Sequence, residues 1–322
     1  MERDRCVTST AHAGILLGMH RPWVPERVIS LQEAQQLLAA QFPEFREATL
    51  EPFAEGWDNT AYLVNGSQVF RFPRRQVAVE LLESECAVLP KLAPQLPWAI
   101  PVPRFTGRDE GQPAWPFAGY DLLPGTTSDR LDLKGDARVR LAAPLGAFLR
   151  ALHSVDATTL PGLVEDRMRR SDGARRVALI RERWHASLEC GLLSDTEVAE
   201  SVLASADVER IPRSDAVCHG DLYARHLLLD DALRPTGVID WGDVHRGDPV
   251  VDLILPWQLL PPSSHATFRE SYGPISDADW SHARLLALAH AIAAGLYAIE
   301  VGDAPFEREV RGSLARLLDR NV

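Results

Sequence analysis

Residues 217–243 read VCHGDLYARHLLLDDALRPTGVIDWGD, and this stretch decides the fold. It places His219, Asp221 and His226 within eight residues, and Asp240 follows 14 positions after His226. Histidines and carboxylates at such spacing suit a metal cage, a hydrolase site, or a loop in which one carboxylate takes a proton while other groups hold a metal ion. Two apolar runs, HLLLDD and TGVIDW, flank an Arg-Pro turn and predict a β-hairpin within the stretch.

Length and composition limit the classes of protein to which this stretch can belong. With 322 residues, 46% of them hydrophobic and 25% charged, the chain is expected to form one large domain or two lobes around a sizeable core. The net charge of −11 argues against a nucleic-acid partner, which needs a footprint of lysine and arginine. The four cysteines form no CxxC pair, which indicates reduced thiols and a cytoplasmic protein.

Two segments bear on targeting and membranes. Residues 1–28 mix acidic residues with a short apolar patch, so we expect a disordered tail rather than a secretory signal, and Met19 is an alternative start. The apolar run from Leu285 to Ile299 contains His290 and is shorter than the roughly 20 residues of a membrane span. It predicts a buried core helix, and no membrane partner is expected.

The sequence on either side of the opening stretch predicts two lobes. Residues 30–42 begin with a serine cap followed by a glutamate three positions later, which predicts a helix. Short β-type runs follow, joined at Asn65-Gly66 by a hairpin turn, then a helical segment over residues 77–93 and strands near 102–107 and 117–125. Helical patterns dominate afterwards, over residues 138–155, 172–189, 195–205, 277–301 and 305–318.

The predicted fold class is therefore α+β and bilobal, with a small β-rich N-lobe over residues 29–121 and a larger helical C-lobe over residues 122–322. The His-Gly-Asp motif at 219–221 with His226, followed by Ile-Asp-Trp-Gly at 239–242, resembles the catalytic and metal-binding loops of the aminoglycoside phosphotransferases. That family has a protein-kinase-like fold. The resemblance extends over roughly residues 51–253 and implies a phosphotransferase that uses a nucleoside triphosphate and Mg²⁺.

The resemblance assigns a role to each matching residue. It makes Asp221 the base that accepts the proton of a substrate hydroxyl, and it makes His226 and Asp240 the ligands of Mg²⁺, while His219 braces the loop. Residues 55–64 match the loop that covers the phosphates, Arg71 stands at the position of the phosphate-binding lysine, and residues 117–125 match the hinge that meets the purine base. The implied nucleotide-binding residues are Gly56, Asn59, Thr60, Arg71, Glu85, Asp121 and Leu123.

Two departures from the family pattern are informative. Arg71 replaces a compact ammonium by a planar fork, which changes the geometry of phosphate binding. His226 replaces an asparagine, although Mg²⁺ prefers oxygen ligands. The same histidine is typical of the aminoglycoside 2″-phosphotransferases and the macrolide 2′-phosphotransferases, so the chain resembles these two branches most, and GTP stands beside ATP as the co-substrate.

The acceptor is expected to be a small molecule with a hydroxyl group, an aminoglycoside in the first instance with a macrolide as the alternative, and the protein is expected to be a monomer. An aminoglycoside needs carboxylates for its ammonium groups, and we expect acceptor contacts from Trp257, Glu270, Asp277, Asp279, Glu300 and Asp303, although the acids also fit a solvated acidic face. Trp57, in the loop that covers the phosphates, is a further candidate for contact with a ligand. A macrolide needs an apolar groove, which residues 253–262, LILPWQLLPP, could furnish. A kinase of a small hydroxylated metabolite is a further alternative.

Two rival classes remain open at this stage. In a metal-dependent phosphohydrolase, a cage would form from His219, Asp221, His226, Asp240 and His245. That reading leaves the β-rich lobe and the hinge unexplained. A non-catalytic pseudokinase would function without the carboxylate of Asp221. The kinase is preferred because the base and both metal-side residues are present.

Overall fold

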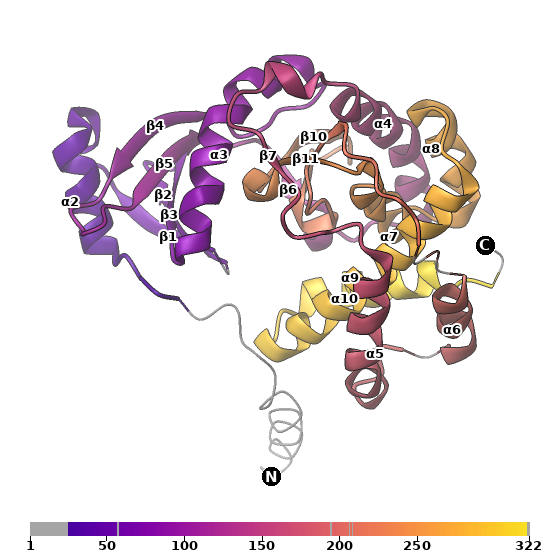
Figure 1. Ribbon diagram of the computed structural model, residues 1–322. Helices are drawn as coiled ribbons and strands as arrows, with labels where there is room; N and C mark the ends of the chain where they lie inside the picture. Colours follow the sequence, from indigo (N-terminus) through magenta and orange to yellow (C-terminus); the bar gives the residue numbers. More distant parts are fainter. Residues whose placement is uncertain (1–24, 57, 194, 206, 208, 321–322) are drawn as a thin grey trace, which may run out of the picture.

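The computed structural model describes residues 25–56, 58–193, 195–205, 207 and 209–320 (Figure 1). Met19, Trp57 and most of the tail predicted over residues 1–28 lie outside this range. Within it, the N–H groups of Glu26 and Arg27 donate to the carbonyl of Arg74 at 2.8 and 3.0 Å. These two residues are therefore tied to the N-lobe.

The N-lobe contains the predicted antiparallel sheet. In the described part of the chain, five strands lie side by side in the order β1-β2-β3-β5-β4. Asn65 and Gly66 join β2 to β3 with φ of 52° and 66°, and the N–H of Ser67 donates to the carbonyl of Val64 at 3.1 Å, so the predicted Asn-Gly turn is confirmed. The strand bounds are β1 (Leu50–Glu55), β2 (Asn59–Val64), β3 (Gln68–Pro73), β4 (Pro103–Arg108) and β5 (Pro116–Asp121).

One helix covers each face of this sheet. Helix α2 (Leu31–Gln41) begins with the predicted capping box of Ser30 and Glu33, and α3 (Gln76–Leu92) connects β3 to β4. Neighbouring residues of β5 point to opposite faces: Phe117 belongs to the cluster beneath α2, and Ala118 belongs to the cluster beneath α3. Because α3 packs against both the sheet and the C-lobe, it links the two lobes.

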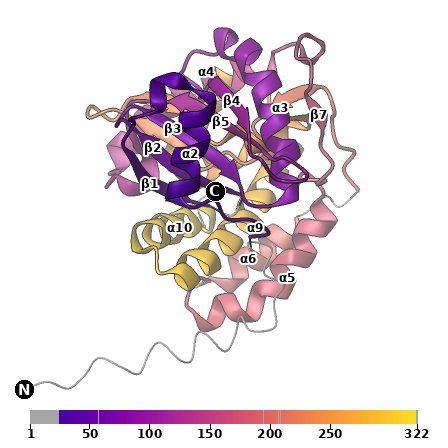
Figure 2. The same cartoon turned by 90° about the vertical axis from the view of Figure 1, so that its left-hand side faces the viewer.

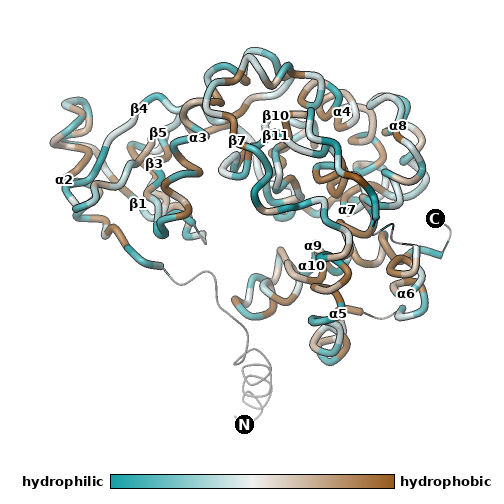
Figure 3. The backbone as a smooth tube through the Cα atoms, in the orientation of Figure 1, coloured by the Kyte–Doolittle hydropathy of each residue, from teal (hydrophilic) through white to brown (hydrophobic). Residues whose placement is uncertain are grey.

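The C-lobe is mostly helical, and its long helices match the predicted segments. Hydrophobic stretches occur in both lobes (Figure 3), but the C-lobe has the larger core. Figure 2 shows α5, α6, α9 and α10 grouped on the side of the C-lobe below the N-lobe sheet. The bounds are α4 (Gly135–His153), α5 (Gly173–Glu189), α6 (Thr196–Ala204), α7 (Ile254–Leu259), α8 (His265–Tyr272), α9 (Asp277–Val301) and α10 (Ala304–Leu317).

Helix α9 is the core helix expected from its apolar sequence. By length and composition it is, among the described residues, the one helix that could cross a membrane, but 56% of its most apolar stretch is buried inside the protein. It packs against α5, α7 and α10. Helices α7 and α8 were not predicted. The continuous apolar run that includes α7 has no amphipathic period.

Short strands build the centre of the C-lobe. Strands β9 (Leu227–Leu229) and β10 (Pro235–Val238) form the predicted antiparallel hairpin, and β6 (Thr126–Thr127) pairs with β9. Strand β11 (His245–Gly247) pairs with β8 (Ala216–Cys218) and with β7 (Val164–Glu165). These pairings bring the two motifs of the opening stretch together, because one motif follows β8 and the other follows β10.

Candidate active site

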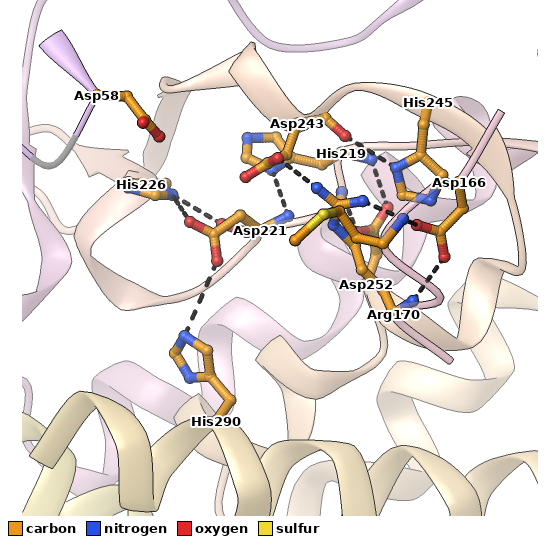
Figure 4. A network of polar contacts seen from close by, with 12 residues as sticks. Asp58, Asp166, Arg170, His219, Asp221, His226, Asp243, His245, Asp252 and His290 are labelled. Carbon is orange, nitrogen blue, oxygen red and sulfur yellow. Dashed lines mark hydrogen bonds and ion pairs between the residues drawn. The ribbon is translucent and has the colours of Figure 1, made fainter. Parts of the chain in front are cut away.

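Asp221 lies in a loop that is fixed through its backbone (Figure 4). The N–H groups of His219 and Gly220 donate to the buried carboxylate of Asp252 at 2.7 and 2.9 Å. Gly220 has a φ of 86°, and a Cβ at this position would lie 2.5 Å from the carbonyl oxygen of Asp243. Only glycine fits there without a shift of the neighbouring backbone.

His219 braces the same loop, and its protonation pattern can be assigned. Its Nε2 lies 3.0 Å from the carbonyl oxygen of Ile239, which can only accept, so Nε2 carries the proton. Its Nδ1 accepts the N–H of Asp221 at 3.2 Å. Burial lowers the pKa of His219 to about 4, which keeps the ring neutral. Since both ring nitrogens are engaged, His219 cannot serve as a ligand in the metal cage of the hydrolase hypothesis.

The carboxyl group of Asp221 is 38% exposed and lies among other charged groups. Loss of water around it raises the pKa of Asp221 to about 7, and the carboxylates of Asp243 and Asp240 act in the same direction, while His226 opposes them. A carboxylate that is harder to keep ionised is a stronger base. Asp221 therefore has the exposure and basicity that proton transfer near neutral pH requires.

His226 and Asp240 together form a donor set for a cation. Nδ1 of His226 lies 2.7 Å from the carbonyl oxygen of Asp221 and must carry the proton of this hydrogen bond. In the neutral ring, the lone pair of Nε2 then faces the Oδ2 atom of Asp240, 3.3 Å away. Two electron-rich atoms in this arrangement fit a divalent cation such as Mg²⁺, and the backbone bond at the other nitrogen orients the ring as in metal-binding histidines.

Arg71 connects the N-lobe to this donor set. Its Nη1 donates to both carboxylate oxygens of Glu85 at 3.0 Å, and its Nη2 donates to Oδ1 of Asp240 at 2.9 Å. Although burial acts to raise it, the charge of Arg71 holds the pKa of Asp240 below its ordinary value. The predicted ion pair of Arg71 with Glu85 is present, and the planar fork extends it to a third residue that a lysine could not also reach.

The predicted nucleotide loop and hinge lie at the two ends of the N-lobe sheet. The N–H of Gly56 donates to the carbonyl of Asn59 at 3.0 Å, which closes the turn between β1 and β2. Oδ1 of Asn59 and Oγ1 of Thr60 are buried and have no hydrogen-bond partner among the described residues. The predicted contact of these two residues with the phosphates stays a prediction.

At the hinge, the side chain of Asp121 pairs with Arg104 at 2.7 Å, so only its backbone is available to a base. The N–H of Leu122 donates to Ser67 at 2.8 Å, whereas the N–H of Leu123 bonds to no residue that the structure describes. The backbone of Leu123 is thus the hinge group with a free donor.

The predicted acceptor residues are not brought together around Asp221. Trp257 is 2% exposed and its indole N–H donates to the carbonyl of Trp280, so its predicted contact with an acceptor is wrong. Residues 253–260 are buried throughout, so the predicted apolar groove is part of the core instead. The physical reason is that this run forms α7 and packs against α9 and α10.

The acidic candidates are mostly paired with arginines. Asp279 pairs with Arg210, and Asp303 pairs with Arg225 of the catalytic loop at 2.6 Å. Asp277 is 93% exposed and pairs with Arg269 at 3.0 Å, while Glu270 and Glu300 are exposed. Asp277 lies 13 residues before His290 on α9, a rise of about 20 Å.

Three side chains near Asp221 were not among the predicted site residues. Asp252 anchors the loop, and it also lies 3.1 Å from Nε2 of His153. Arg170 pairs with Asp166 and Asp243 beside the metal-binding loop. His290 of α9 faces Asp221 from the opposite side (Figure 4). A polar residue inside an apolar helix was the only sequence signal for His290, and no motif singles out the other two.

Comparison with known proteins assigns the chain to a family. Residues 49–317 match the model of the phosphotransferase enzyme family. The chain belongs to this family. It is a kinase dependent on a nucleoside triphosphate, and the recognition of the aminoglycoside phosphotransferases is confirmed.

Solved structures agree with the bilobal fold. The GDP complex of aminoglycoside 2′-phosphotransferase-IIIa superimposes with a TM-score of 0.65 at 23% identity, covering 90% of this chain and 99% of that one. A macrolide 2′-phosphotransferase from Brachybacterium faecium gives 0.59 at 24% identity, with 88% and 98% covered. In sequence, the phosphotransferase is 25% identical over 225 residues to the uncharacterised protein YcbJ of Bacillus subtilis (strain 168), covering 66% of this chain and 70% of that protein.

Proposed function

We propose that this phosphotransferase moves the γ-phosphoryl group of ATP or GTP to a hydroxyl group of an antibiotic. The observation that carries the proposal is the half-exposed carboxylate of Asp221, held in a loop with a fixed backbone beside the cation-binding pair of His226 and Asp240. A base next to a cation site is the arrangement that phosphoryl transfer to an alcohol requires.

Each group of the site has a step in this mechanism. The backbone near Leu123 binds the purine base, and the turn between β1 and β2, with Gly56, Asn59 and Thr60, covers the phosphates and offers N–H and O–H donors to them. Arg71 holds the phosphates against the C-lobe while Glu85 orients its fork. His226 and Asp240 would hold a divalent cation, which would supply positive charge against the phosphates. Asp221 orients the acceptor hydroxyl and takes its proton as the oxygen attacks the γ-phosphorus.

The charges around the site bear on the acceptor. Aminoglycoside binding needs free carboxylates, whereas Asp277, Asp279 and Asp303 already pair with arginines. The middle of α9, which faces Asp221, carries His290, Ala294 and Tyr297 and no acid. These observations favour a weakly charged acceptor such as a macrolide over an aminoglycoside. As separate expectations, the protein is cytoplasmic and a monomer.

A turnover assay tests both parts of the proposal. Purified protein with Mg²⁺ and either ATP or GTP is incubated with erythromycin, kanamycin, gentamicin, choline or homoserine, and the release of nucleoside diphosphate is measured. We expect stimulation by erythromycin above all, and a loss of about 10²- to 10⁴-fold in Asp221→Asn. Asp215→Asn, which removes an exposed carboxylate just before β8, is the matched control.

Three outcomes would contradict the proposal in different ways. Stimulation by kanamycin or gentamicin alone would show that the acceptor is an aminoglycoside and not a macrolide. Equal turnover by Asp221→Asn would remove the base from the mechanism. Release of phosphate from phosphate esters without any nucleoside triphosphate would favour the phosphohydrolase.

A further inference from the structure

His290 and Asp221 lie close enough to each other for one oxygen atom to bond to both. Its Nε2 lies 3.9 Å from Oδ1 of Asp221, and its side chain is 24% exposed (Figure 4). This distance is too long for a hydrogen bond between the two groups. An oxygen atom that lies to one side of the line between them can be about 2.8 Å from both, because 3.9 Å is shorter than twice that length.

The proton of the His290 ring is fixed by its neighbour on α7. The side-chain amide nitrogen of Gln258 donates to the carbonyl oxygen of Ala287 at 3.0 Å, which establishes the orientation of the amide group. The same nitrogen lies 2.9 Å from Nδ1 of His290 and donates its second proton there. Nδ1 is therefore the acceptor, and the ring N–H is on Nε2, which points toward Asp221.

The surroundings hold the ring in this state. Burial lowers the pKa of His290 to about 3, so the ring is neutral at physiological pH. The ring of Tyr223 lies 4.7 Å from that of His290 and 4.3 Å from that of His226, measured between centroids. Tyr223 thus contacts both histidines, and the two lie near different oxygens of Asp221, His290 near Oδ1 and His226 near Oδ2.

We propose that His290 is a positioning residue that donates its Nε2–H to the oxygen of the acceptor hydroxyl. The inference rests on the proposed function. The hydroxyl proton goes to the carboxylate of Asp221, the oxygen forms the new bond to the γ-phosphorus, and the bond from that phosphorus to the bridging oxygen of the nucleoside diphosphate breaks. His290 keeps its proton throughout and holds one lone pair of the nucleophile, so that another faces the phosphorus.

This contact also selects the chemical class of the acceptor. A hydroxyl oxygen can accept from Nε2–H while it donates to Asp221, but a protonated amine has no lone pair and cannot accept. In a substrate that carries hydroxyl and ammonium groups, His290 therefore favours a hydroxyl next to Asp221 and disfavours an ammonium there.

Steady-state kinetics of the full chain test the inference. His290→Leu removes the donor and keeps the bulk, whereas His290→Gln places an amide N–H near the position of Nε2. The acceptor is the compound of the panel above that gives the highest turnover, and water, measured as basal hydrolysis of the nucleotide, serves as a second acceptor. His185→Ala, which removes an 85% exposed histidine of α5, is the control.

We expect His290→Leu to lower kcat/KM for the acceptor about tenfold, the value of one hydrogen bond, with the KM for the nucleotide unchanged. His290→Gln should recover most of this loss. Circular dichroism and the melting temperature of both variants check that they are folded.

The remaining outcomes separate the inference from the proposed function. Normal acceptor kinetics in His290→Leu, a parallel rise in the KM for nucleotide, or no recovery in His290→Gln would overturn the role of His290 while the phosphotransferase activity stands. If the unaltered protein shows no nucleotide turnover with any acceptor of the panel or with water, the proposed function is overturned and the inference with it.

Discussion

The catalytic loop, residues 219–226, and the face of α9 opposite Asp221 are held by different means. The loop is fixed by backbone N–H groups that donate to Asp252 and by Gly220, where a Cβ would clash with the carbonyl oxygen of Asp243. The face of α9 presents His290, and a side chain of another helix, Gln258, sets its proton. The loop backbone depends on one glycine and one buried carboxylate, whereas a face built by side chains of distant helices can change with a few substitutions. This difference suits one fold that serves many acceptors.

Removal of the anchor should have the largest effect on the loop. Asp252→Asn replaces a buried carboxylate that accepts two N–H groups and contacts His153, so we expect a loss of about 3 kcal/mol in the free energy of unfolding. Denaturant titration at neutral pH measures this value.

The same variant gives a pH dependence with a defined sign. Although burial acts to raise it, the hydrogen bond and charge of His153, with the other donors, hold the pKa of Asp252 below its ordinary value. The stability that it contributes is therefore present above the unfolded pKa of about 4 and is lost as the pH falls through the folded pKa. The difference between the unaltered protein and Asp252→Asn should shrink below about pH 4. A difference independent of pH would show that the charge of Asp252 is not what stabilises the loop.

Gly220 and Gly302, both with left-handed backbone, offer a matched comparison between the regions. A Cβ on Gly220 would clash with the carbonyl of Asp243, whereas a Cβ on Gly302, at the end of α9 with a φ of 71°, meets nothing within 4 Å. We expect Gly220→Ala to lower kcat about 10²-fold through displacement of Asp221. Gly302→Ala should cost about 1 kcal/mol of stability and leave kcat unchanged. Equal effects on kcat would contradict the rigid loop.

A smaller effect is expected where the lobes meet. Arg71→Lys cannot reach Glu85 and Asp240 at the same time, so one charge-assisted contact is lost and the KM for the nucleotide should rise about tenfold. Arg108→Lys, which changes an exposed pair with Glu83, is the control and should have no effect. An unchanged KM in Arg71→Lys would mean that the fork is not needed for phosphate binding.

The smallest effect is expected at the acidic end of α9. Asp277 is exposed and pairs with Arg269 far along the helix from His290, so Asp277→Asn should leave the KM for the acceptor unchanged within about twofold. A clear rise in the KM for kanamycin or gentamicin in this variant would restore the acidic binding face and weaken the contrast between the two regions.

The sequence was most informative where short motifs carry the functional residues. The motif at 219–221 and the aspartate at 240 identified the family and its fold, because phosphoryl transfer needs these groups at set positions on two consecutive loops. The Asn65-Gly66 turn and the Ser30 cap were equally readable, since each is a backbone conformation that few residues adopt. Prediction failed for residues 253–262 because an apolar run does not reveal whether it lines a groove or fills the core.

By itself, the sequence determined the family and the two lobes, and it pointed to the loops at residues 219–226 and 239–243 that we propose to act in catalysis, because all of these depend on short patterns and their spacing. Only the tertiary structure decided which nitrogen of each histidine is available, which carboxylates are already paired, and that His290 meets Asp221, 69 positions away in the chain. Those features depend on contacts between helices that are distant in sequence, and a contact of this kind leaves no local pattern to read.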